Sequence, residues 1–95
     1  SPVEKTKGLA VSSKPVSDAV LYHAQASLDE SALLVVKEVY GTSPKLILEG
    51  LENGYYFVRF SAIDANGVEG FSDVRTVLYQ PPPNSNLWLE DFIKP

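Results

Sequence analysis

One stretch, residues 51–73, limits the possible fold more than any other part of this 95-residue chain. Every second residue over one span of it is apolar, and these residues are Tyr56, Val58, Phe60 and Ala62. Successive side chains on a strand point to opposite faces, so the row predicts a strand with one side against a core. Asn53-Gly54 precedes the row and Asn66-Gly67 follows it, and both dipeptides are strong tight-turn signals. Because β-type residues resume at 74–79, the stretch predicts antiparallel strands.

Shorter segments elsewhere carry the same two-residue period. We expect strands around Leu9 and Val11, at 19–26, at 32–40 with a fully buried start, at 45–49 and at 71–79. In the strand at 19–26, the residues predicted to face the core are Val20, Tyr22, Ala24 and Ala26. Turn signals about every 8–12 residues, together with 44% hydrophobic residues, predict an all-β fold, an antiparallel β-sandwich of about seven strands.

A proline run divides the chain into two parts. We expect residues 1–80 to form the sandwich and residues 81–95 to form a proline-rich linker with an apolar tail, because three consecutive prolines at 81–83 cannot join a strand ladder. The large apolar residues of the tail are Leu87, Trp88, Leu89, Phe92 and Ile93. Such a tail can dock on the sandwich, begin a further module or bind a partner. The chain contains no Met, so we expect a processed chain or a domain of a longer protein.

Several classes of function are disfavoured by composition. The net charge is -4 and the eight basic residues are dispersed, which argues against nucleic-acid binding. No apolar run approaches the roughly 20 residues that cross a bilayer, so we expect no membrane span. The absence of Cys excludes disulfides and thiolate sites, and His23 is the only histidine.

No catalytic signature is present either. We find no phosphate-binding loop, nucleophile elbow or HExxH motif, and we therefore expect no enzyme activity and no cofactor. Asp64-Ala65-Asn66-Gly67 has a faint resemblance to a calcium loop, but the glycine falls at position four where an EF-hand requires it at position six. We interpret this segment as a plain turn and expect no metal site.

Residues 51–72 resemble the end of a fibronectin type III domain. In that family a Leu precedes a turn, a Tyr opens strand F, alternating apolar residues run to an Ala, and a Gly- and Asn-rich turn and a Ser follow. The residues that fit are Leu51, Tyr56, Val58, Phe60, Ala62, Asn66, Gly67, Gly70 and Ser72. By this resemblance Tyr56 is the corner tyrosine, with its hydroxyl bonded to a backbone group between Leu51 and Gly54.

Residues 55–70 are similar to a bacterial subset of such domains, the Ig-like or fibronectin-like repeats of FecR-type envelope proteins, which often carry LysM modules. This resemblance implies an extracytoplasmic location, in the periplasm or cell envelope. Residues 8–13 lack the core Trp that is usual in the second fibronectin strand. Related sandwiches of sensor kinases and phage tails therefore remain alternatives.

One predicted surface goes beyond a plain sandwich. If Tyr56 and its row point inward, Tyr55, Phe57 and Arg59 point outward. In a fibronectin-like order the strand at 19–26 lies beside them, which adds Leu21, His23 and Gln25. Exposed aromatics beside Leu and Arg have the composition of an interface core. Trp88 or Phe92 of the tail, or a second copy of the chain, can also cover this face.

These observations predict a non-catalytic binding or spacer module that mediates protein–protein contacts. The alternative is a carbohydrate-binding module whose platform is Tyr55, Phe57 and Trp88, since exposed rings stack on sugars. A third hypothesis is an accessory domain of an envelope enzyme or sensor.

Overall fold

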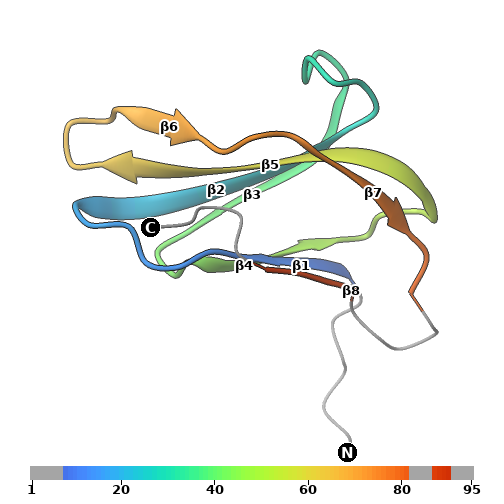
Figure 1. Cartoon of the computed structure of the whole chain (residues 1–95), viewed down its shortest axis with the longest axis horizontal. Helices are drawn as coiled ribbons and strands as arrows, with labels where there is room; N and C mark the ends of the chain where they lie inside the picture. Colours follow the sequence, from blue (N-terminus) through green and yellow to red (C-terminus); the bar gives the residue numbers. More distant parts are fainter. Residues whose placement is uncertain (1–7, 82–86, 91–95) are drawn as a thin grey trace, which may run out of the picture.

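The computed structural model describes residues 8–81 and 87–90, which form eight strands in two sheets (Figure 1). The strands are β1 (Gly8–Ser12), β2 (Ala19–Ser27), β3 (Val35–Gly41), β4 (Lys45–Glu49), β5 (Gly54–Asp64), β6 (Glu69–Phe71), β7 (Arg75–Tyr79) and β8 (Leu87–Leu89). The fold is therefore all-β, with the two layers of a β-sandwich. The described residues form no helix, and so none that is long and apolar enough to cross a membrane.

The larger sheet is built around β5. Its order is β3-β2-β5, and both β6 and β7 pair with the far edge of β5, all antiparallel. The smaller sheet has the order β4-β1-β8, in which β4 is antiparallel and β8 parallel to β1. β2 and β5 lie side by side, as predicted, and they pair with Ala24 opposite Phe60. In Figure 1 the larger sheet lies above the smaller one.

The core lies between the sheets and follows the predicted alternation along β5. Tyr56, Val58 and Phe60 are buried, and side chains from both sheets meet them. The other members of the buried cluster are Leu9, Val11, Tyr22, Ala24, Ala26, Leu46, Leu48, Val77 and Tyr79. The hydroxyl of Tyr56 donates to the carbonyl of Glu52 at 2.6 Å, which is the bond predicted between Leu51 and Gly54. Burial, followed by the nearby Glu52, raises the pKa of Tyr56.

Two predicted strands have different limits. The strand expected at 32–40 starts only at Val35, and the segment expected to be buried instead exposes Leu33 and Leu34. The strand expected at 71–79 is two strands, β6 and β7, because the chain breaks the ladder at Ser72. There the Ser72 amide donates to the carbonyl of Phe60 at 2.6 Å, while the Ser72 Oγ accepts from the Phe60 amide at 3.0 Å.

One inward-facing prediction in β2 is wrong. Val20 is 54% exposed, whereas Ala19 packs against the core. The register between β2 and β5 shifts between Ala19 and Leu21, so the irregularity turns Val20 away. From Tyr22 to Ala26 the alternation is as predicted.

The turn at 64–68 is tightly specified. The Asp64 Oδ1 accepts hydrogen bonds from the backbone amides of Asn66 and Val68, both at 2.9 Å. Gly67 has a φ of 82°, a conformation that favours glycine. The segment is the turn that its sequence predicts.

Candidate interaction surface

The outer face of the larger sheet carries six of the predicted surface residues. Leu21, Gln25, Phe57 and Arg59 are half-buried on this face, and Tyr55 is 69% exposed. His23 also lies on this face, but it is only 3% exposed because neighbouring strands cover it.

The two tail residues do not join this group. Trp88 lies in β8 opposite Ala10, at the edge of the smaller sheet, where the Lys45 Nζ is 4.2 Å from the centroid of its ring. Phe92 lies outside the described residues. The predicted sugar platform is therefore divided, with Tyr55 and Phe57 on one sheet and Trp88 on the other.

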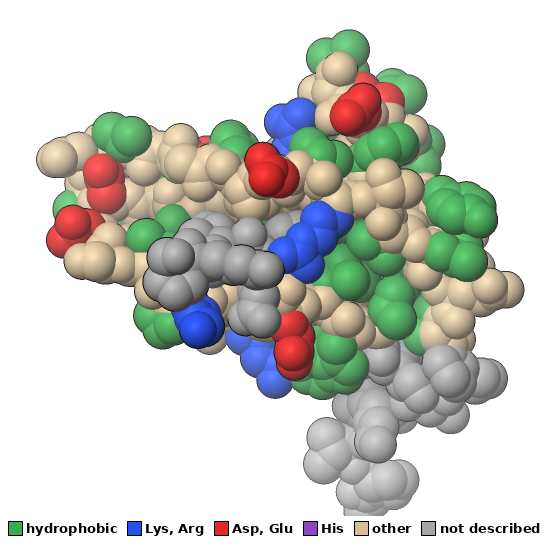
Figure 2. All heavy atoms as spheres, in the orientation of Figure 1, with side chains coloured by type: hydrophobic (Ala, Val, Ile, Leu, Met, Phe, Trp, Pro, Cys, Tyr) green, Lys and Arg blue, Asp and Glu red, His purple; other side chains and the backbone are tan. Residues whose placement is uncertain are grey.

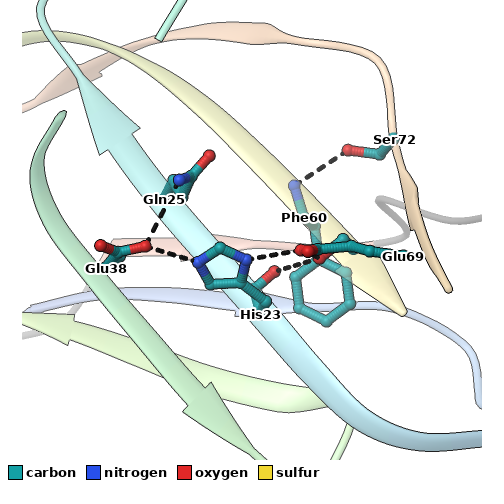
Figure 3. A network of polar contacts seen from close by, with 7 residues as sticks. His23, Gln25, Glu38, Phe60, Glu69 and Ser72 are labelled. Carbon is teal, nitrogen blue, oxygen red and sulfur yellow. Dashed lines mark hydrogen bonds and ion pairs between the residues drawn. The ribbon is translucent and has the colours of Figure 1, made fainter. Parts of the chain in front are cut away.

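His23 on β2 is the centre of a polar network that connects four strands, β2, β3, β5 and β6 (Figure 3). Its Nε2 lies 2.7 Å from the Glu38 Oε1 on β3, and its Nδ1 lies 2.6 Å from the Glu69 Oε2 on β6. The Ser61 Oγ on β5 donates to the same oxygen of Glu69 at 2.5 Å. The ring of Tyr40 stacks on the imidazole with centroids 4.0 Å apart and planes 3° apart.

This geometry constrains the protons of the network. A neutral imidazole has one donor nitrogen and one acceptor nitrogen, so it can donate to only one carboxylate. Both contacts are hydrogen bonds to carboxylates only when His23 is an imidazolium. The bond from His23, followed by the bond from Gln25, lowers the pKa of Glu38.

The network satisfies the buried polar atoms of two side chains, His23 and Ser61. The Ser61 Oγ contacts the carbonyl of His23 and the carboxylate of Glu69, and the two ring nitrogens of His23 contact the two glutamates. No group of three or more His, Asp or Glu in residues 8–81 and 87–90 is arranged to hold a metal ion. The two-residue period predicts His23 on this face, but it does not predict Glu38 and Glu69 beside it, since they are 15 and 46 residues away along the chain.

A second feature is an accumulation of exposed apolar side chains where β5 begins and β2 and β7 end. We call it the apolar end, and it consists of Leu28, Leu33, Leu34, Val36, Tyr55 and Leu78. Tyr55 and Leu78 are cross-strand partners, and Leu28 directly follows the β2 residue that pairs with Phe57. In Figure 2 hydrophobic side chains occupy the tip of the projecting β2–β3 loop and the end of the molecule below it.

The β2–β3 loop presents its leucines in a fixed shape. The Asp29 carboxylate accepts the backbone amides of Leu33 at 3.1 Å and of Leu34 at 2.8 Å. The Leu28 amide donates to the carbonyl of Leu34, and Ala32 adopts a left-handed φ of 58°. The bonds from Leu34 and then Leu33 lower the pKa of Asp29. Leu33 is consequently held 83% exposed rather than in a strand.

The loop is also attached to the sheet and borders a groove. The Arg59 Nη2 donates to the carbonyl of Glu30 at 2.9 Å, which ties the loop to β5. Between the β2–β3 and β4–β5 loops lies a groove of about 340 Å³. Its lining is Leu28, Val36, Lys37, Gly50, Leu51, Glu52 and Tyr56. The apolar end thus combines a projecting tip with an adjacent concave surface.

Comparisons of the chain with protein-family models, with curated proteins and with solved structures found no match.

Proposed function

We propose that this sandwich is a non-catalytic binding module that contacts another protein through its apolar end. The observation that carries the proposal is the fixed exposure of three leucines on the β2–β3 loop, which are Leu28, Leu33 and Leu34. Large apolar groups gain free energy on leaving water, and a loop already held in shape loses little conformational entropy on binding.

The surroundings of these side chains fit a protein partner. Glu30, Lys37 and Glu52 lie on or beside the loop and groove, so an apolar centre has a polar margin. Interfaces between proteins have this arrangement. The similarity of residues 55–70 to repeats of FecR-type envelope proteins supports a place for the module in a larger extracytoplasmic bacterial protein.

A carbohydrate ligand is the second candidate, because the exposed ring of Tyr55 can stack on a sugar. It is the weaker one, since Trp88 lies on the other sheet and the only aromatic among the described residues that line the groove beside the loop is the buried Tyr56. Addition of cell-wall glycans distinguishes the two candidates. Shifts of the Tyr55 ring signals at saturating glycan would favour the sugar.

The test of the protein-binding proposal is photo-crosslinking. A photoreactive amino acid at Leu33, with Ser43 of the exposed β3–β4 turn as the control position, is exposed to envelope proteins. We expect a discrete protein adduct from position 33 only. Adding Leu28→Asp should reduce its yield about tenfold or more, since burying one leucine is worth roughly 1.5–3 kcal/mol. An adduct whose yield is insensitive to Leu28→Asp would refute this use of the apolar end.

A further inference from the structure

The edge of β1 is occupied by a segment that comes from the far end of the chain. β8 pairs in parallel with β1 over three residues, with Leu9, Ala10 and Val11 opposite Leu87, Trp88 and Leu89. β8 therefore completes the smaller sheet on the side away from β4. This site is separate from the apolar end, which belongs to the larger sheet.

Residues of three other strands form the binding site for β8. Leu87 and Leu89 are half-buried and pack against the core cluster. Trp88 points away from the core, and the Lys45 Nζ of β4 lies over its ring. The Arg75 Nη1 of β7 donates to the carbonyl of Glu90 at 2.9 Å. The site thus binds a short strand that has apolar residues at alternate positions and a backbone carbonyl just beyond it, which Arg75 contacts.

We propose that this β1 edge is a strand-binding site that accepts the Leu87–Leu89 strand of a second copy as well as its own. Exchange of the strands between two copies produces a dimer in which both edges are filled. Every contact named above is identical whether the strand arrives from the same chain or from another one. Exchange of identical elements is a general route to dimers for this reason.

The β8 strand of the same chain is bound weakly enough to dissociate from the β1 edge. Parallel pairing is slightly less stable per residue than antiparallel pairing, and only three residues take part. The gain from two half-buried leucines is offset largely by the cost of ordering the segment. Once the strand has left, the backbone groups of the β1 edge are unpaired, and an open edge is a template for another strand.

The connection between β7 and β8 is short, since it consists of residues 80–86. A short connection gives the chain's own strand an effective concentration of about millimolar at the β1 edge. Exchange is therefore expected at comparable protein concentrations, or where copies are held close together.

The first experiment uses the full chain with Leu87→Asp and Leu89→Asp, which can accept a strand but cannot supply one. The probe is a synthetic peptide of residues 84–95, and the control peptide carries the same two substitutions. We expect saturable shifts of the Leu9, Ala10 and Val11 amides with the first peptide, with half-saturation near millimolar, and none with the control. A folded acceptor whose β1 amides do not respond at several millimolar peptide overturns the proposal.

A second measurement begins with the unaltered chain. The same peptide, added to the unaltered chain, should compete with β8 and move the Trp88 side-chain signal toward its free position. Sedimentation of the unaltered chain should show dimers at millimolar concentration, and Leu89→Asp should abolish them. Dimers that persist in Leu89→Asp but disappear in Leu33→Asp would assign self-association to the apolar end and overturn the exchange.

Discussion

At the scale of single residues, the bond from Tyr56 to Glu52 gives the most direct test of the core. The hydroxyl is buried and donates at 2.6 Å to a backbone carbonyl four residues earlier. Tyr56→Phe leaves that carbonyl without its partner, so we expect a loss of about 1–2 kcal/mol in unfolding free energy. Chemical denaturation measures it. Tyr55→Phe is the matched control because Tyr55 is exposed, and equal midpoints for the two variants would contradict the prediction.

The hydrogen bond between His23 and Glu38 predicts how the stability of the fold depends on pH. The hydrogen bond from His23 lowers the pKa of Glu38 below 4.5, its ordinary value. A lowered folded-state pKa contributes stability that is present above pH 4.5 and disappears as pH falls through the folded value. Because Glu38 is half-exposed, we expect less than about 1 kcal/mol.

The carboxyl carbon of Glu38, followed by NMR, reports this titration directly. His23→Gln should move its midpoint upward, while the folded dispersion of the spectrum remains. An unchanged midpoint in that variant would show that His23 is not the cause of the lowered pKa.

At the scale of elements, prediction from sequence succeeded where one strand carries a strong pattern and tight turns limit it. β5 and the inward rows of β4 and most of β2 follow alternation alone. Alternation did not predict the start of β3 correctly, because the Asp29 carboxylate binds the amides of Leu33 and Leu34 and so competes with strand pairing. β8 was not predicted, since three residues carry no period and their partner lies some 80 residues away.

Prediction of the candidate site from sequence was limited in the same way. Tyr55, Phe57 and Leu21 were placed on the correct face by a period of two. The burial of His23 was not predicted, because it depends on which glutamates the register of β3 and β6 brings beside it. The apolar end was missed for a related reason, since Leu33 and Leu34 were assigned to the buried start of a strand.

The close approach of β1 and β4 makes a prediction about these two elements. A Cβ at Gly8 would lie 2.6 Å from the backbone oxygen of Leu48 and 2.8 Å from a methyl carbon of Ile47. Gly8→Ala should therefore separate the strands and cost about 1–3 kcal/mol, as overpacking does. Gly70→Ala in β6 is the control, because nothing lies within 4 Å of its Cβ position. Thermal midpoints of the two variants that agree within error would contradict this packing.

At the scale of the whole molecule, the two sheets depend on one core. The buried cluster draws on β1 and β4 from one sheet and on β2, β5 and β7 from the other. Separation of the two sheets would expose the apolar inner faces of both to water, so these five strands should unfold together. β8 is different, because only the half-buried Leu87 and Leu89 connect it to that cluster.

Trp88 allows this difference to be measured, since it is the only tryptophan of the chain and belongs to β8. We expect its fluorescence to change at lower denaturant concentration than the circular dichroism of the sandwich. The reason is local opening, which requires less free energy than global unfolding where few apolar contacts hold a segment. Leu89→Asp should abolish the early fluorescence change and leave most of the cooperative transition intact. If both signals share one midpoint in the unaltered chain, β8 is part of the cooperative core and does not open separately.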